Sequence, residues 1–253
     1  MPTTTDTPIS PATATMLVRL EKYVLPIICG FLAWQRLRYL QQQYTAWHFV
    51  NSHPGMSLFA PRVFYADLTK NFLIFAIQAF TGLTLLSNRA PAVLPDKLKH
   101  VMVPLAASYY MILYGLVGYF PLSMQQSMLP DAWRFPVAMA ALACSIIGYA
   151  IAVWAIVYLR RSFAVFVSVR DVVTNGPYRL VRHPIYCGYL LDAAGLLLAA
   201  SSVGMLLLCC GYVVLLVCRA RMEEEMLAKS DPAYRHYLAR TGFLFPRLAS
   251  LAG

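Results

Sequence analysis

The longest apolar run of the chain, residues 137–159, constrains the fold more than any other feature. It contains no charged residue, and no polar face recurs along it at the helical period. About 20 consecutive apolar residues are enough for an α-helix to cross the hydrocarbon core of a bilayer. The chain as a whole has a mean hydropathy of +0.58 and only 13% charged residues, far from the averages of soluble domains. The sequence therefore predicts an integral membrane protein.

Other apolar segments of similar character predict an all-α fold with five to six transmembrane helices. The fold ends in a C-terminal helical hairpin and a cytoplasmic C-terminal helix. The expected spans are residues 23–40, 72–86, 101–120, 137–159, 185–200 and 203–218. The first of these holds Arg36 and Arg38 near its end, so it is either a short span with snorkelling arginines or an interfacial helix. Residues 41–70 are expected to form an irregular loop or a surface-lying helix.

The chain is expected to form one membrane domain preceded by a short tail. Residues 1–15 are rich in Thr and Pro, and they predict a disordered N-terminal tail. Residues 16–253 form the membrane domain, with variable N-terminal spans over 16–135 and a core that carries the chemistry over 136–253. Within residues 137–159, Ala140, Cys144 and Gly148 recur every four residues and predict a seam for close helix packing.

The net charge of +10 has a simple explanation in membrane topology. With six spans and a cytoplasmic N-terminus, most of the 21 Lys and Arg residues fall on the cytoplasmic side, as the positive-inside rule requires. The basic residues lie in separate loops and are not interleaved with aromatic residues on one polar face, which argues against nucleic acid. Anionic membrane lipids are the expected partners of this charge.

The six cysteines do not predict a metal site. Nearly all of them lie inside apolar runs, there is no CxxC motif, and no histidines stand at metal-ligand spacing. They are interpreted as small hydrophobic residues, and no metal is expected. There is also no GxG sequence in the chain, which excludes the glycine loop of a Rossmann dinucleotide site.

The densest chemical information lies in residues 174–192, at the entrance to the final hairpin. A turn signal at 175–177 is followed by Arg182 and His183, and then by Pro184, which is tolerated in the first turn of a helix. Where the last span ends, Arg219 and Glu223 stand four residues apart and share a helix face. The hairpin returns this pair to the cationic cluster, and ionisable groups at membrane depth are costly and tend to mark function.

These groups predict a pocket for a cationic, polar cofactor at the base of the hairpin. Glu223 supplies a carboxylate, Tyr178 and Tyr186 supply aromatic faces, and His183 supplies a hydrogen-bonding imidazole. A sulfonium is attracted to aromatic faces, and an amino or hydroxyl group is attracted to a carboxylate. From the residues alone, the prediction is a membrane enzyme with a polar cofactor pocket on the cytoplasmic side.

The same residues resemble the isoprenylcysteine carboxyl methyltransferase family and its phospholipid-methyltransferase relatives. The resemblance covers roughly residues 160–247. It rests on Gly176-Pro177-Tyr178-Arg179-x-Val181-Arg182-His183-Pro184-x-Tyr186-x-Gly188, then Arg219-x-x-x-Glu223-Glu224, and then Tyr234-x-x-Tyr237. It implies an S-adenosylmethionine-dependent methyltransferase that acts on a lipophilic acceptor entering from the bilayer.

The resemblance also implies roles for individual positions. The cofactor-binding residues would be Arg170, Asp171, Val172, Val173, Tyr178, His183, Pro184, Ile185, Tyr186 and Glu223. Arg219 would face the acceptor and orient a carboxylate. For an amine or thiol acceptor, His183 or Glu224 would take the proton. The prenylcysteine enzymes often have His in place of Arg170 and a polar residue in place of Ile185. The resemblance therefore implies the cofactor, S-adenosylmethionine, more directly than it implies a prenylcysteine substrate.

Two other functions remain open on the sequence. A membrane reductase of the sterol type, which binds NADPH, also has an Arg-His-Pro-x-Tyr core, but its Asn is replaced here by Ile185. A non-catalytic membrane scaffold would use the Arg and Glu clusters only to fix topology. Cofactor binding distinguishes the three functions: a methyltransferase binds S-adenosylmethionine, a reductase binds NADPH, and a scaffold binds neither.

Overall fold

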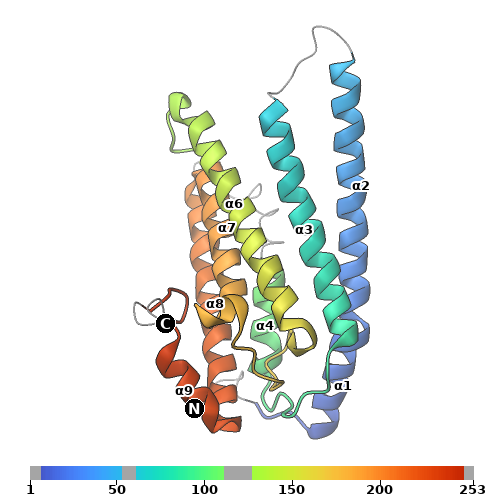
Figure 1. The fold of residues 1–253 in the computed structure, drawn as a ribbon, viewed down its shortest axis with the longest axis vertical. Coiled ribbons are helices and arrows are strands. Elements are labelled where there is room, and N and C mark those ends of the chain that lie inside the picture. Colours follow the sequence, from blue (N-terminus) through green and yellow to red (C-terminus); the bar gives the residue numbers. More distant parts are fainter. Residues whose placement is uncertain (1–6, 53–60, 111–126, 248–253) are drawn as a thin grey trace.

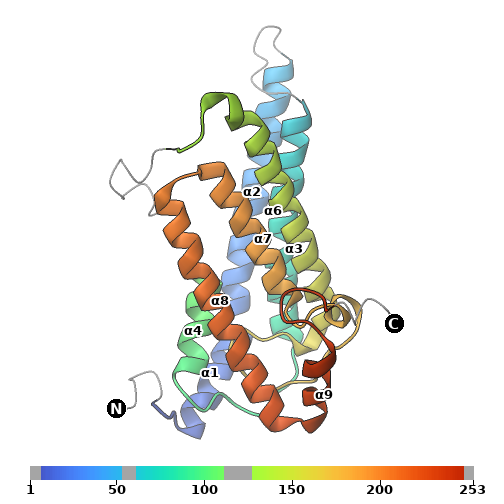
Figure 2. The ribbon, with the colours of Figure 1, turned by 90° about the vertical axis from the view of Figure 1, so that its left-hand side faces the viewer.

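The computed structural model describes residues 7–52, 61–110 and 127–247, and over these ranges the protein is a bundle of long helices (Figures 1 and 2). The helices are α1 Pro11–Tyr23, α2 Leu25–Asn51, α3 Pro61–Ser87, α4 Lys99–Tyr109, α6 Asp131–Leu159, α7 Pro184–Ala200, α8 Val203–Ser230 and α9 Pro232–Arg240, with 3-10 turns η3 Arg160–Ser162 and η4 Gly176–Arg179. Extended pairing in the described part is limited to three isolated bridges. The all-α prediction is therefore confirmed.

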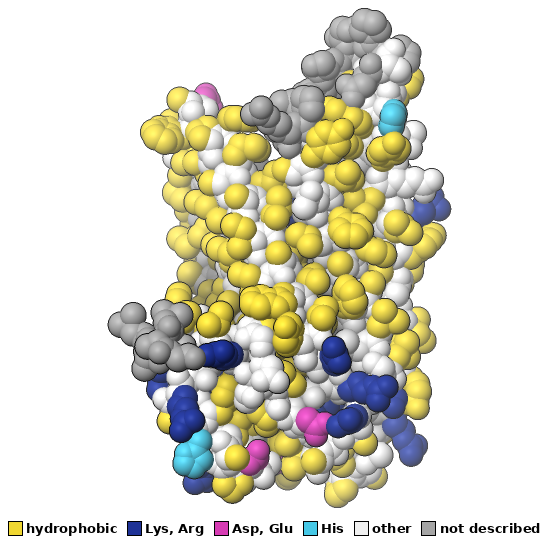
Figure 3. Space-filling view, in the orientation of Figure 1, with side chains coloured by type: hydrophobic (Ala, Val, Ile, Leu, Met, Phe, Trp, Pro, Cys, Tyr) yellow, Lys and Arg dark blue, Asp and Glu magenta, His cyan; other side chains and the backbone are white. Residues whose placement is uncertain are grey.

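Three helices of the described part are long and apolar enough to cross a membrane. They are α6, α8 and the portion of α3 from Phe64 to Ser87, and α7 is a shorter apolar helix beside them. Large hydrophobic side chains point outward from the bundle, and on the face in Figure 3 they cover its upper and middle part. Most of the Lys and Arg side chains on that face gather at the end where α1 and α9 lie. The total of five to six spans stays a prediction.

Most of the first predicted span, residues 23–40, and the first part of the predicted loop after it belong to one long helix. Helix α2 continues without a break from Leu25 to Asn51 and lies beside α3 along its length (Figures 1 and 2). Arg36 therefore lies inside a 27-residue helix, where its Nη1 donates to the Asn71 side-chain oxygen of α3 at 2.8 Å. Residues 41–51 belong to this helix and are not an irregular loop, and 61–70 begin α3. The predicted span 101–120 lies outside the described residues from 111 onward.

The predicted disordered tail is wrong for residues 11–15, because α1 begins at Pro11. Ser10 caps the helix by accepting from the Thr13 backbone N–H at 3.1 Å, and Pro11 stands at the first helical position, where its missing N–H costs nothing. The Thr and Pro residues of this segment therefore form the capped N-terminus of α1. Residues 1–6 lie outside the described residues.

The sequence predicts a seam of small residues for close helix packing, and two of its three positions, Cys144 and Gly148, lie where α6 meets α7. Gly148 is buried, whereas Ala140 is exposed; the buried positions around it are Ala141, Ser145 and Ala152. A Cβ added to Gly148 would stand 2.4 Å from the backbone oxygen of Gly188 on α7. Only glycine allows the two backbones to approach this far.

Replacing Gly148 by Ala is expected to destabilise the protein by about 1–3 kcal/mol, because the added methyl group meets backbone that cannot rotate away. Thermal unfolding of the purified protein in lipid nanodiscs measures the change. Gly30→Ala in α2 is the matched control, since a Cβ there meets nothing within 4 Å. Equal melting temperatures for the two variants would contradict the packing argument.

The final hairpin agrees closely with the prediction. Helix α7 ends at Ala200, Ser201 takes a left-handed conformation with φ of 45°, and Ser202 caps α8 by accepting from the Met205 N–H at 3.3 Å. Helix α8 then runs 28 residues to Ser230, so the predicted span 203–218 and the charged segment after it form one helix. Asp231 caps α9 through the Ala233 N–H at 2.8 Å.

Loops at the lower end of the bundle close over the base of this hairpin. The segment 163–170 lies against residues 92–100, where Val167 N–H donates to the His100 carbonyl at 3.0 Å and Ala92 N–H to that of Val169 at 2.8 Å. After α9, the chain returns to residues 181–183, and Arg182 N–H donates to the Gly242 carbonyl at 2.8 Å. Segments far apart in sequence therefore form one floor beneath the long helices.

Candidate active site

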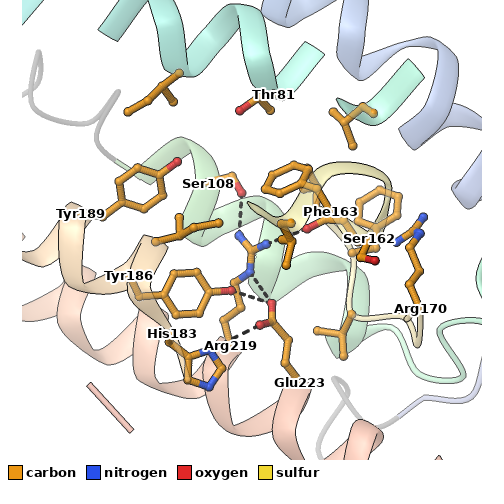
Figure 4. A pocket seen from close by; sticks show the side chains of 18 of the residues that line it. Thr81, Ser108, Ser162, Phe163, Arg170, His183, Tyr186, Tyr189, Arg219 and Glu223 are labelled. Atoms are coloured by element: carbon orange, nitrogen blue, oxygen red, sulfur yellow. Dashed lines mark hydrogen bonds and ion pairs between the residues drawn. The ribbon is translucent and has the colours of Figure 1, made fainter. Parts of the chain in front are cut away.

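A cavity of about 670 Å³ lies above this floor, between α3, α6, α7, α8 and the segment 162–173 (Figure 4). Its volume is in the range of pockets that bury small organic ligands. Polar side chains gather at its lower end, and tyrosines with aliphatic residues line the part among the helices. The cavity thus opens from a charged floor into the apolar bundle.

Glu223 of α8 is the central carboxylate of this lower end. Its Oε1 accepts from Arg219 Nε at 3.0 Å and from the Tyr186 hydroxyl at 2.6 Å. Its Oε2 lies 3.8 Å from His183 Nδ1, beyond hydrogen-bond distance. The side chain keeps 25% exposure. One oxygen is therefore fixed by the protein, and the other is available on the cavity wall.

Arg219 joins three parts of the fold at this point. Besides Glu223, its Nη1 donates to the Ser108 hydroxyl of α4 at 2.9 Å, and its Nη2 donates to the Ala164 carbonyl of the loop at 3.3 Å. Its guanidinium also lies over the Tyr186 ring, 5.4 Å from the centroid. The side chain is 7% exposed, so Arg219 is a buried cation held by a carboxylate and an aromatic face.

His183 lies on the cavity wall beside Tyr186, and Glu224 lies behind it. The His183 ring stacks on Tyr186, with centroids 5.2 Å apart and planes 3° from parallel. Its Nε2 lies 3.0 Å from Glu224 Oε1, which also accepts from Arg182 Nε. Arg182 donates further to the carbonyls of Leu238 and Thr241 after α8. This chain of contacts fixes the imidazole edge that faces Glu223.

Tyr178 occupies the turn that precedes these residues. The Tyr237 hydroxyl of α9 donates to the Tyr178 carbonyl at 2.6 Å and holds the turn η4 against the C-terminal segment. Burial raises the pKa of Tyr178 well above its ordinary value, and the nearby carboxylate of Glu223 adds to the rise. Burial likewise raises the pKa of Tyr237. Both phenols stay protonated at physiological pH, so they act as neutral donors and aromatic surfaces.

The structure brings most of the predicted site residues to one cavity. Those that line it are Arg170, Asp171, Val172, Val173, Tyr178, His183, Ile185, Tyr186, Arg219 and Glu223. Pro184 and Glu224 do not line it: Pro184 starts α7 behind the wall, and Glu224 faces the ion pair with Arg182. Glu224 therefore contacts the cavity lining through His183 and Arg182.

The side chain of Arg170 is turned away from the ligand position that the resemblance implies. Its Nη2 lies 3.3 Å from Glu21 Oε2, its Nε donates to the Arg89 carbonyl at 3.1 Å, and its Nη1 donates to Ser168. With 3% of the side chain exposed, the guanidinium is occupied in holding the loop to α1. In Figure 4 it lies apart from the cluster of Tyr186, Arg219 and Glu223.

Sequence reasoning missed two groups that shape the site. Glu21 of α1 is completely buried, and its Oε1 accepts from the backbone N–H groups of Val165 and Phe166, besides the pair with Arg170. Asp192 of α7 lines the cavity among the helices, where the Tyr149 hydroxyl donates to it at 2.7 Å. A lone acidic residue inside an apolar segment was the available signal for Asp192, whereas Glu21 stands between Arg19 and Lys22 and gave no such signal.

The fold and site together define a class of protein: a helical membrane protein with a polar pocket at the base of a C-terminal hairpin. Residues 137–231 match the family model described as phospholipid methyltransferase. The matched range runs from α6 through the end of α8, and it contains Tyr186, Arg219 and Glu223. The similarity to this family therefore covers the final hairpin and the helix before it.

Two curated proteins are similar to parts of this chain. The cobalt-zinc-cadmium resistance protein CzcN of Cupriavidus metallidurans is 34% identical over 94 residues, which is 36% of this chain and 44% of that protein. The nickel-cobalt-cadmium resistance protein NccN of Alcaligenes xylosoxydans xylosoxydans is 27% identical over 126 residues, 47% of this chain and 54% of that protein. The chain thus spans about half the length of these relatives. Its described residues hold no group of three His, Cys, Asp or Glu side chains arranged for a metal ion.

Proposed function

We propose that the protein is an integral membrane methyltransferase that uses S-adenosylmethionine and transfers the methyl group to a lipophilic acceptor. The observation that carries this proposal is the position of Glu223. It lies on the cavity wall inside the family-matched segment, with one oxygen fixed by Arg219 and Tyr186 and the other left for a ligand. A carboxylate presented in this way suits an amino or hydroxyl group of a cofactor.

The residues around Glu223 fit S-adenosylmethionine. Its sulfonium is attracted to aromatic faces, which Tyr178 and Tyr186 supply on the same wall. The backbone and side chains of 171–173 and of Ile185 complete the lower lining. When bound, the cofactor supplies a methyl group on a sulfonium, which passes to a nucleophile and leaves a neutral thioether. The protein contributes alignment and exclusion of water, because the site is closed by the floor and by apolar helices.

Arg219 and His183 have distinct tasks in this scheme. Arg219 retains two N–H groups beyond the three that contact Glu223, Ser108 and Ala164, and these can orient an anionic acceptor. A carboxylate acceptor loses no proton. For an amine or a thiol, the proton passes to His183, whose Nε2 is held by Glu224. Glu224 then acts as a positioning residue.

The site is proposed to face the cytoplasm. Lys and Arg side chains gather at the end of the bundle that contains the floor (Figure 3), and the cytoplasmic ends of membrane proteins carry an excess of these residues. The lipophilic acceptor enters between the helices from the bilayer, where the cavity is lined by apolar side chains.

Incubating the purified protein with native membrane lipids and methyl-labelled S-adenosylmethionine is expected to move the label into the lipid extract. Mass-resolved analysis of that extract identifies the acceptor and the modified atom. A parallel titration with S-adenosylmethionine and with NADPH is expected to give binding of the first alone. Binding of NADPH alone would support a sterol-type reductase, and binding of neither would support the scaffold.

A further inference from the structure

A second polar group lies in the same cavity, deeper among the helices. Asp192 of α7 is 7% exposed, and its Oδ2 accepts from the Tyr149 hydroxyl of α6 at 2.7 Å; both residues line the cavity. Six residues along α7 separate Asp192 from Tyr186, a rise of about 9 Å. The proposed mechanism of methyl transfer uses neither Asp192 nor Tyr149.

Gln78 of α3 adds an acceptor to this level of the cavity. Its Oε1 is fully buried and has no hydrogen-bond partner within the described ranges, and the residue lines the cavity. Gln78 stands one turn above Thr81, which Figure 4 shows at the upper edge of the site. Three helices thus supply polar groups to the cavity above the level of Arg219.

An entirely apolar ligand tail is a poor match for this level. A buried hydrogen-bond acceptor without a donor loses the hydrogen bonds that it makes in water. A carboxyl group in a membrane segment is also costly in free energy, and such groups tend to have a functional partner. Tyr149 donates to Asp192 and Ser145 hydrogen-bonds it as well, so the acceptor without a partner at this level is Gln78 Oε1. A hydroxyl or ammonium group of a ligand can supply the donor that Gln78 lacks.

We infer that Asp192, Tyr149 and Gln78 form an inner subsite that binds a hydroxyl or ammonium group of the methyl acceptor, about 9 Å along α7 from the level of Tyr186. The acceptor is therefore an amphiphile with a second polar group along its chain. Calling the ligand a methyl acceptor rests on the proposed function. The existence of the subsite is tested separately, by ligand binding.

Three acids of equal chain length test the subsite: octanoate, 8-hydroxyoctanoate and 8-aminooctanoate. A chain of roughly eight carbons spans the distance between the two levels. With the full-length protein in lipid nanodiscs, the hydroxy and amino acids are expected to bind about tenfold or more tightly than octanoate. Asp192→Leu is expected to remove or reverse this preference, and Gln78→Leu to reduce it. Asp131→Asn, at an exposed residue near the start of α6, leaves it unchanged.

The outcomes separate this inference from the proposed function. Equal binding of the three acids, binding of none, or a preference that survives Asp192→Leu would overturn the inner subsite. Binding of S-adenosylmethionine is measured on the same samples and is expected to be retained in Asp192→Leu. Loss of cofactor binding in wild type would instead defeat the methyltransferase proposal. If Asp192 only joins α6 to α7, its substitution lowers the melting temperature without changing the order of the three affinities.

Discussion

Glu223→Gln is expected to weaken binding of S-adenosylmethionine at least about a hundredfold, while insertion into the membrane is unchanged. The amide keeps the shape of the side chain but removes the charge that Arg219 and Tyr186 fix on the cavity wall. A charge-assisted hydrogen bond contributes about 1.5–3 kcal/mol, and loss of the charge affects each cationic or donor group of the ligand. Equilibrium binding of labelled cofactor to purified protein measures the effect.

Glu225→Gln is the matched control for this experiment. Glu225 lies two residues away on the same helix, is 62% exposed and forms an ion pair with Lys229, so its substitution is expected to leave binding unchanged. His183→Ala, which removes the ring stacked on Tyr186, is expected to weaken binding as Glu223→Gln does. Full cofactor affinity in both Glu223→Gln and His183→Ala would refute the assigned site.

Glu21→Ala is expected to destabilise the protein by about 3–5 kcal/mol. The substitution leaves Arg170 as a buried cation without its carboxylate and leaves two backbone N–H groups, those of Val165 and Phe166, without their acceptor. Because these residues belong to the loop that lines the cavity, cofactor affinity is expected to fall together with stability. Unfolding in lipid nanodiscs and cofactor titration give the two readouts.

The double substitution Glu21→Leu with Arg170→Met separates charge from packing. Replacing both partners of a buried ion pair by apolar residues is often close to neutral, whereas removing one partner is costly. The double variant is therefore expected to recover most of the stability lost in Glu21→Ala. If it is as unstable as the single variant, the interaction between the two charges is not what holds the loop.

Local signals account for the parts of the fold that the sequence predicts well. Pro184 marks the start of α7, the Ser201-Ser202 link forces an antiparallel hairpin, and Asp231 before Pro232 marks the start of α9. The cavity residues around Glu223 follow from the hairpin, because an antiparallel return brings Arg219 back to Tyr186. Capping and turn residues, together with the antiparallel direction of the hairpin, are sufficient to predict these features.

Contacts between distant segments account for the parts that the sequence does not predict. The partner of Arg170 is Glu21, 149 positions earlier, so no local pattern indicates that this arginine turns away from the ligand. Ser108 likewise reaches Arg219 from α4. Of the predicted small-residue seam, Cys144 and Gly148 face α7 but Ala140 is exposed, because the sequence alone does not show which side of α6 the α7 backbone approaches.

The unbroken length of α8 links the site to the thickness of the membrane. Its 28 residues extend about 42 Å, whereas the hydrocarbon core of a bilayer is about 30 Å thick. Glu223 therefore stands near the lipid headgroups on a rigid extension of a membrane helix. A thicker bilayer draws that rigid extension toward hydrocarbon, and a thinner one lifts it toward water. The lipid composition of the host membrane is therefore expected to change how deeply the cavity and Glu223 lie in the bilayer.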